Sequence, residues 1–255
     1  MEQVHPIGTR GVISIGCPIY RSAAYCDHVY NSLYKYTPHL SDGRAEFYFV
    51  ANDATREVKA HLNSRGYPHY LQENSGFTDE ELTARGLAEP EYITRCYRAF
   101  NRIYSEARGG ICVQISSDFA FSPGWLDALL ERNDGASIVS SQLIEPEDKA
   151  NREAGAIIGD FGRHPRQFDE AGFLAKAEEV RRAGTRPGGQ YGPWLIPMVL
   201  FHENGGYPEG NLANGRKYGI PGDVALVRRY ALLGTRHITA CDSVVYHFCE
   251  GEMRE

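Results

Sequence analysis

The sequence predicts an α/β fold in which a mostly parallel central sheet is flanked by helices. In the first third of the chain, apolar runs alternate with amphipathic helical patterns, the order that parallel strands with crossover helices require. The apolar run at residues 111–115 shows little alternation, as expected of a strand covered on both faces. A chain of 255 residues can bury one large core, so we expect a single domain in two halves, residues 1–118 and 119–255.

Hydrophobic periodicity predicts the first elements in order. They are a strand at residues 11–16, a loop at 17–21, a helix over about 23–36, a strand at 46–51, a charged helix ending near 64, and a short strand at 69–72. This succession of strand, helix, strand, helix and strand is typical of a parallel sheet.

A long amphipathic helix over residues 93–107 comes next, and Gly109-Gly110 ends it before the strand at 111–115. Ser122 and Pro123 then suit the start of another helix. Asp118 therefore falls at the carboxyl end of a central strand, where open α/β sheets bind ligands. The alternative, equally weighted from this segment alone, is that Asp118 only caps a turn.

The second half is less regular. The pattern predicts a strand near 136–142, a charged and glycine-rich excursion at 145–190 with a helix over about 168–183, a strand at 194–201, a helix at 223–233, and two short strands at 237–240 and 243–247.

Composition excludes several classes of protein. The formal net charge of −6 gives no electrostatic footprint for nucleic acid. Six scattered cysteines without a CxxC pair argue against a zinc knuckle or a disulfide framework. No apolar run approaches the roughly 20 residues of a transmembrane helix, and the first residues lack a secretion signal. We therefore expect a cytoplasmic protein.

Five segments, in this order and spacing, resemble a family 2 glycosyltransferase of the GT-A fold, the inverting group that uses nucleotide-diphosphate sugars. The resemblance covers nearly the whole chain. The segments are Pro18-Ile19-Tyr20, Asn52-Asp53-Ala54-Thr55, Asn101-Arg102 through Gly109-Gly110, Ser116-Ser117-Asp118 with Pro123-Gly124-Trp125-Leu126, and Gly205-Gly206-Tyr207 followed by Gly222-Asp223. It implies a Rossmann-like sandwich whose first half binds the nucleotide-sugar and whose second half binds the acceptor and carries out catalysis.

The resemblance also implies a set of donor contacts. Asp53 matches the carboxylate that accepts a hydrogen bond from a nucleobase, usually uracil. The remaining nucleotide-sugar contacts would be Pro18, Ile19, Tyr20, Asn101, Arg102, Ser117, Gly205 and Gly206. The alternatives are structural: a proline turn for the first segment, a helix-capping turn for Asp53, and surface ion pairs for Asn101 and Arg102.

Asp118 matches the last carboxylate of the family's Asp-x-Asp motif, which binds Mg²⁺ or Mn²⁺ bridging the donor phosphates. Ser116 stands where the first Asp would be, so the protein supplies less negative charge to the metal. His247 matches a further metal ligand near the end of the domain, and an imidazole favours Mn²⁺. A lone histidine on a strand is otherwise more often structural.

Asp223 matches the catalytic base, which takes the proton of the acceptor hydroxyl. Gly222 replaces the Glu that usually precedes it, and Asp223 could instead be a helix N-cap. Trp194 and Tyr207 are expected beside the acceptor.

The leading hypothesis is thus a metal-dependent glycosyltransferase of the hexosyltransferase type. Its donor is expected to be a UDP-sugar and its acceptor a glycan, a lipid-linked glycan or a small molecule, with peripheral membrane contact but no transmembrane segment. Two alternatives are a sugar nucleotidyltransferase and a degenerate nucleotide- or carbohydrate-binding module without turnover. The former normally has a glycine-rich basic loop after its first strand, which Cys17-Pro18-Ile19-Tyr20-Arg21 does not resemble.

Overall fold

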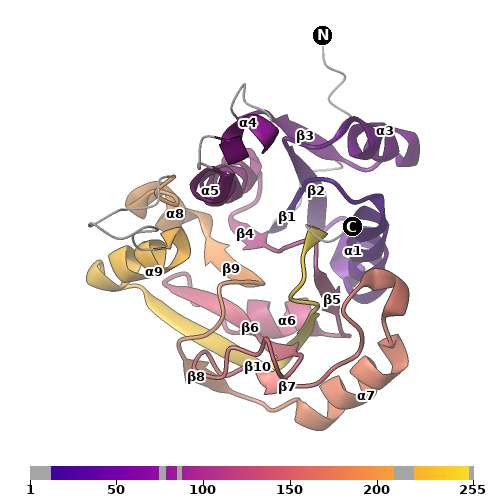
Figure 1. Ribbon diagram of the computed structural model, residues 1–255. Coiled ribbons are helices and arrows are strands. Elements are labelled where there is room, and N and C mark those ends of the chain that lie inside the picture. Colours follow the sequence, from indigo (N-terminus) through magenta and orange to yellow (C-terminus); the bar gives the residue numbers. More distant parts are fainter. Residues whose placement is uncertain (1–12, 75–78, 85–87, 210–220, 253–255) are drawn as a thin grey trace.

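The computed structural model describes residues 13–74, 79–84, 88–209 and 221–252, and it has an α/β architecture (Figure 1). The described strands form one sheet in the order β3-β2-β1-β4-β9-β6-β10-β5, with β7 beside β6 and β8 beside β10. The strands are β1 (Ile13–Ile19), β2 (Ala45–Asn52), β3 (His69–Gln72), β4 (Ile111–Gln114), β5 (Phe119–Phe121), β6 (Ser137–Glu145), β7 (Ile157–Ile158), β8 (Thr185–Pro187), β9 (Trp194–Pro197) and β10 (Arg236–His247).

Helices lie on both faces of this sheet. They are α1 (Ala23–Tyr36), α2 (Pro38–Ser41), α3 (Arg56–Arg65), α4 (Asp79–Ala84), α5 (Ala88–Glu106), α6 (Trp125–Glu131), α7 (Glu170–Val180), α8 (Met198–Asn204) and α9 (Gly222–Leu232), with a 3₁₀ turn at Pro165–Gln167. None of the helices in the described ranges is long and apolar enough to cross a membrane.

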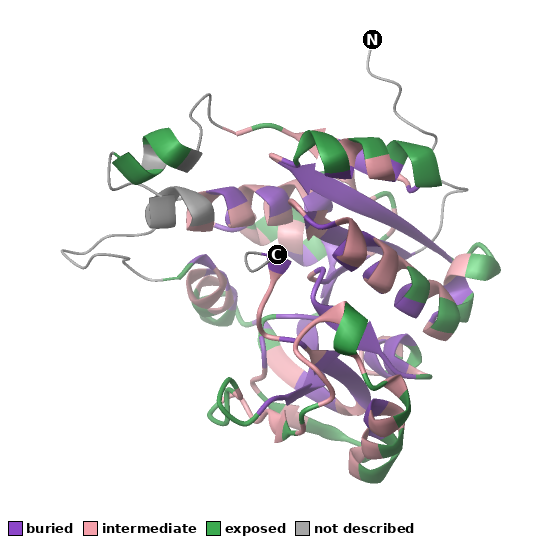
Figure 2. Cartoon of the chain, turned by 45° about the vertical axis from the view of Figure 1, so that its right-hand side comes forward, coloured by how far each residue is buried: buried purple, intermediate pink, exposed green. Residues whose placement is uncertain are grey.

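The expected parallel half is confirmed. β1 pairs in parallel with β2 and β4, and β2 pairs in parallel with β3. Side chains alternate between the faces of these strands: Phe47 and Phe49 pack toward α1, α3 and α6, whereas Tyr48 and Val50 pack toward α5, α8 and α9. Figure 2 shows the resulting buried sheet between helices whose outer faces are exposed.

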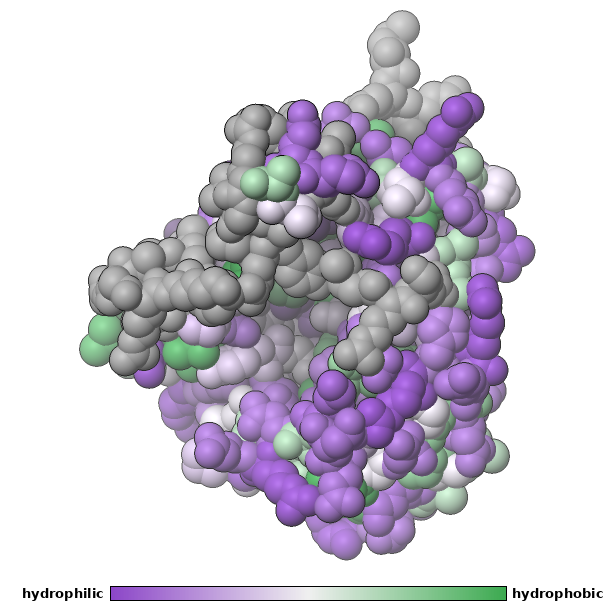
Figure 3. Space-filling view, in the orientation of Figure 1, coloured by the Kyte–Doolittle hydropathy of each residue, from purple (hydrophilic) through white to green (hydrophobic). Residues whose placement is uncertain are grey.

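The second half is held by β6 and β10, which pair in parallel, while β9 runs antiparallel to both β4 and β6. β9 thereby joins the two halves into one sheet. The segment between β6 and β9 carries β7, α7 and β8, and its outer surface is mostly hydrophilic (Figure 3).

Four expectations about elements were wrong. β1 continues through Pro18 and Ile19, which we had placed in a loop. The predicted strand at 194–201 ends at Pro197, and α8 follows. The two final strands are a single strand, β10, with a register shift between Ala240 and Val244. Ser122 is not an N-cap, because α6 begins after Gly124 and the Ser122 hydroxyl donates to the carbonyl of Val244 instead.

Candidate active site

A cluster of polar side chains forms where β4, β6 and β10 end. His247 is the last residue of β10 and pairs with Phe119, so strand register places it beside Asp118. Parallel pairing of Tyr246 with Ile144 likewise brings His247 beside Glu145, the last residue of β6. The pairing of the strands thus places two carboxylates beside one imidazole.

The His247 ring lies between these carboxylates. Its Nε2 is 3.1 Å from Asp118 Oδ2, and its Nδ1 is 2.8 Å from Glu145 Oε1. Cys249 adds a thiol 3.2 Å from Nδ1. One ligand atom each from Glu145, His247 and Cys249 lies within 4.8 Å of the others, a grouping that could hold a metal ion.

Asp118 and His247 each shift the pKa of the other. Burial alone would raise the pKa of Asp118, but the charge of His247 and hydrogen bonds from its ring and from the Gly251 backbone outweigh burial and lower that pKa. Burial alone would lower the pKa of His247, but Asp118, Cys249 and Glu145 together raise it well above its ordinary value. Asp118 is therefore held as a carboxylate at neutral pH.

Of the expected donor residues around β1, Ile19 is buried, whereas Tyr20 and Ser117 share a partner, and their donor contacts stay predictions. Ile19 is 1% exposed and belongs to the core, so its side chain has no surface for a nucleoside in this conformation. The backbone N–H of Tyr20 and the hydroxyl of Ser117 donate to the same group, the carboxylate of Glu252, at 3.1 and 2.8 Å. Tyr20 and Ser117 therefore do meet at one place.

Asp53 has no capping role. Thr55 caps α3, its hydroxyl accepting from the Val58 N–H at 3.3 Å. The Asp53 carboxylate instead accepts from the backbone and side-chain amides of Asn74 at 2.9 Å each and forms an ion pair with Arg95 at 3.2 Å. These contacts fix the carboxylate at the end of β2, and its role as a nucleobase contact stays a prediction.

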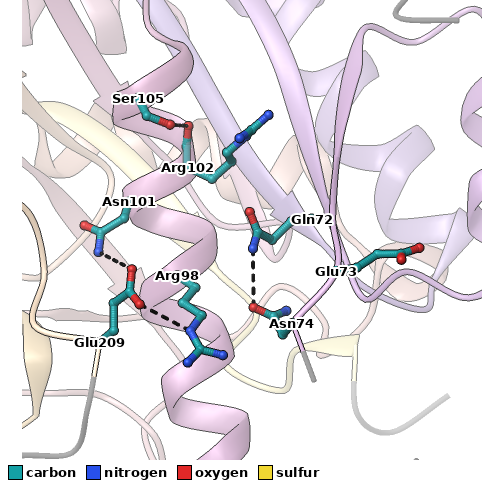
Figure 4. Close-up of a pocket in the computed structure, with 8 residues that line it drawn as sticks. All are labelled: Gln72, Glu73, Asn74, Arg98, Asn101, Arg102, Ser105 and Glu209. Carbon is teal, nitrogen blue, oxygen red and sulfur yellow. Dashed lines mark hydrogen bonds and ion pairs between the residues drawn. The ribbon is translucent and has the colours of Figure 1, made fainter. Parts of the chain in front are cut away.

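Asn101 and Arg102 line a polar pocket of about 540 Å³ between the end of β3 and one face of α5 (Figure 4). Asn101 donates to the Tyr207 carbonyl at 2.9 Å and accepts from the Tyr207 N–H at 2.7 Å, so it holds the turn after α8. Arg102 pairs with Glu106 at 2.7 Å, as in the surface ion-pair alternative. A Cβ atom at Gly206 would collide with the Asn101 side chain, which would then have to give up its present position.

Gly205 lies in the same turn, and the Tyr230 hydroxyl donates to its carbonyl at 3.0 Å. Both glycines therefore pack against protein groups from α5 and α9. A donor contact by this turn stays a prediction.

Asp223 lies in the first turn of α9, apart from the Asp118 cluster. Its Oδ1 accepts from the Val224 N–H at 2.7 Å and from the Tyr97 hydroxyl at 3.4 Å. Burial raises the pKa of Asp223, and these two hydrogen bonds only partly oppose the increase. The carboxylate is thus a better proton acceptor than an ordinary aspartate.

An aromatic network connects Asp223 to the sheet. The Tyr97 ring stacks on Tyr207 with centroids 5.4 Å apart, and the Tyr207 hydroxyl donates to Gln114 Oε1 at 2.6 Å. A Cβ at position 222 would lie 2.7 Å from the Tyr97 ring, so a larger residue there would force the ring to move.

Trp194 and Tyr207, expected beside the acceptor, are 0% and 3% exposed. Their rings belong to the core in this conformation and offer no open face. Tyr191 is 37% exposed and packs edge-on against Trp194, and burial together with the charge of Asp223 raises its pKa.

Sequence reasoning missed Glu145, Cys249 and Glu252. Glu145 carried a usable signal, since it ends an apolar strand as Asp118 follows one. Cys249 and Glu252 had none, because their positions depend on how the chain turns after β10.

Comparison with solved structures decides the fold. A mannosyltransferase from Pyrobaculum calidifontis, in complex with GDP-Man and Mn²⁺, matches 96% of this chain with a TM-score of 0.56 and 14% identity. Residues 1–349 of S. aureus TarS match 92% with a TM-score of 0.56 and 13% identity, and GalNAc-T7 with UDP, GalNAc and Mn²⁺ matches 92% with a TM-score of 0.57 and 14% identity. The chain has a GT-A glycosyltransferase fold.

The match covers 59%, 60% and 43% of those three structures, so this chain spans about half the length of each. No protein-family model and no curated protein sequence matches the chain. The fold expectation is therefore confirmed, while the specific family and the individual site roles stay predictions.

Proposed function

We propose that the protein is an inverting, metal-dependent glycosyltransferase of the hexosyltransferase type. It would transfer a sugar from a nucleotide-diphosphate donor, with UDP the first candidate, to an acceptor hydroxyl. The observation that carries this proposal is the meeting of Asp118, His247 and Glu145 at one sheet edge of a glycosyltransferase fold. The mannosyltransferase in complex with GDP-Man and Mn²⁺ and GalNAc-T7 with UDP, GalNAc and Mn²⁺ support the reaction class.

The residues at this edge fit a divalent metal. Glu145 accepts from Nδ1 of His247 and so orients the ring, which leaves Nε2 beside the Asp118 carboxylate. Asp118 and His247 Nε2 would hold the ion once the proton between them has left, and the carboxylate oxygen suits Mn²⁺ or Mg²⁺. The grouping of Glu145, His247 and Cys249 includes a thiol, which suits softer metals instead. The ion, when bound, supplies positive charge to the leaving diphosphate.

Asp223 would act as the general base. An inverting transfer needs one carboxylate to take the acceptor proton on the face opposite the leaving group. Burial has already raised the pKa of Asp223, and the Tyr97 hydroxyl orients it. Tyr191 has an exposed ring whose pKa is influenced by the charge of Asp223, and this ring is our candidate contact for an acceptor sugar.

Calorimetric titration of UDP and GDP, each with and without Mn²⁺, tests the proposal on the intact protein. We expect binding that requires metal and that Asp118→Asn weakens by at least about tenfold, since a metal ligand is lost. Asp127→Asn removes an exposed carboxylate from α6 and is the matched control. Nucleotide binding that is indifferent to both metal and Asp118 would contradict the mechanism.

A product assay separates an enzyme from a binding module. Incubation of UDP-sugars and GDP-sugars with Mn²⁺ should release the nucleoside diphosphate, at least by slow hydrolysis when no acceptor is present. Metal-dependent binding without any release, across donors and acceptors, would instead favour a module that has lost turnover.

A further inference from the structure

The chain beyond β10 turns back across the candidate active site. The Phe248 N–H donates to the Asp118 carbonyl at 3.0 Å, and the Gly251 N–H donates to the Asp118 carboxylate. Figure 1 shows this segment running from the end of β10 toward α1. Asp118 is left only 8% exposed. We call residues 248–252 the strap.

The strap ends in a buried carboxylate with several donors. Glu252 Oε2 accepts from the backbone N–H groups of Tyr20, Arg21 and Ser22 at 3.1, 2.8 and 2.9 Å. Its Oε1 accepts from the Ser117 hydroxyl at 2.8 Å and from the Tyr20 N–H at 3.3 Å. Glu252 is only 8% exposed.

These donors form an anion-binding site at the junction of β1 and α1. Three successive N–H groups converge on one oxygen just before a 14-residue helix whose N-cap is Ser22. The buried Glu252 carboxylate is direct evidence that the site accepts an anion. Burial nevertheless raises the pKa of Glu252 despite these hydrogen bonds, so the carboxylate is less favourably solvated here than in water.

The site coincides with residues assigned to the nucleotide-sugar donor. Glu252 uses the N–H of Tyr20 and the hydroxyl of Ser117, and Gly251 covers Asp118. A donor phosphate or other anionic group cannot share these donors with a carboxylate, because two anions in one buried site repel each other.

We propose that the strap is an internal competitor of the donor: Glu252 fills the anion-binding site, and an anionic group of the nucleotide-sugar displaces it. This inference rests on the proposed function. Only molecules whose strap is open can bind the donor. The apparent affinity is therefore the intrinsic affinity multiplied by the fraction of molecules with an open strap. It also keeps Asp118 covered until a donor arrives.

The test compares three variants of the full chain with the wild type. Glu252→Ala removes the competing carboxylate, Glu252→Gln keeps its shape without its charge, and Glu250→Gln removes a carboxylate two residues away that faces Arg163. Titration with UDP, GDP and inorganic pyrophosphate, each with Mn²⁺, should show binding about tenfold tighter for Glu252→Ala, an intermediate gain for Glu252→Gln, and no change for Glu250→Gln.

Hydrogen exchange gives a readout that does not depend on nucleotide binding. The amides of Tyr20, Arg21 and Ser22 should exchange faster in ligand-free Glu252→Ala than in the wild type, and adding the tightest ligand should restore their protection. Unchanged exchange at these amides would show that Glu252 does not occupy the site.

The two proposals fail in different ways. Wild-type binding together with unchanged or weaker binding by both Glu252 variants would overturn the competitor role alone, because Glu252 would then be neutral or a donor contact. Absence of nucleotide binding by all four proteins would overturn the proposed function, and this inference with it.

Discussion

Asp118 and Asp223 are both poorly exposed aspartates, yet their surroundings have opposite effects on their charge. Hydrogen bonds and the charge of His247 lower the pKa of Asp118, whereas burial raises the pKa of Asp223. Carboxylates whose environments separate their pKa values commonly divide the tasks of an active site. Under the proposed function, this difference suits Asp118 to hold a cation and Asp223 to accept a proton.

Exchange of each aspartate for asparagine should separate these tasks most strongly. Asp223→Asn is expected to lower kcat by about 10²–10⁴-fold while nucleotide affinity stays unchanged, because only proton transfer is lost. Asp118→Asn should weaken metal-dependent nucleotide binding as well. Steady-state kinetics and titration on the same preparations measure both. An equal loss of nucleotide affinity in the two variants would remove the distinction.

Ionised Asp118 and ionised Asp223 should also have opposite effects on the free energy of unfolding. A lowered folded-state pKa means that ionised Asp118 stabilises the fold, a contribution present above the unfolded pKa and lost as pH falls through the folded one. A raised pKa means that ionised Asp223 destabilises the fold above its unfolded pKa.

At pH 7, Asp118→Asn should therefore lower the free energy of unfolding by about 3–5 kcal/mol, as when one partner of a buried ion pair is removed. Asp223→Asn should leave that free energy equal or slightly higher. Urea denaturation measures both values, with Asp127→Asn as the exposed control. Two losses of similar size would show that the two environments do not differ as described.

Much of the fold and part of the site could be predicted from sequence because they depend on local patterns. Periodicity located β2, β3, β4 and the helices α3 and α5 between them, although it missed α4, and Asp118 lies just after β4 as predicted. Asp118 and His247 meet because both lie at strand ends of one sheet, and their joint role as metal ligands stays a prediction.

Other features depend on tertiary pairing and had no local signal. Pro18 can remain in β1 because it pairs there with β2 alone, since the pairing of β1 with β4 ends at Gly16. Its missing N–H therefore leaves no hydrogen bond to β4 unmade. Glu252 reaches the first strand from the opposite end of the chain, 232 residues from Tyr20. A single carboxylate with that separation has no sequence signature.

The smallest expected effect concerns the hydrogen bond between Tyr97 and Asp223, whose 3.4 Å length makes it weak. This bond lowers the pKa of Asp223 and so partly offsets burial. Tyr97→Phe removes the hydroxyl and keeps the ring that stacks on Tyr207, so the pKa should rise further.

A general base must be unprotonated, so activity is lost as pH falls through its pKa. The acid limb of the kcat profile of Tyr97→Phe should consequently move to higher pH, with only a few-fold loss of kcat on the plateau, as expected for one weak hydrogen bond. Tyr104→Phe, a change on the same helix and also in the core, is the control and should leave the limb in place. A limb that stays fixed in Tyr97→Phe would mean that the group titrating in the rate profile is not Asp223, and the contrast between the two aspartates would then rest on Asp118 alone.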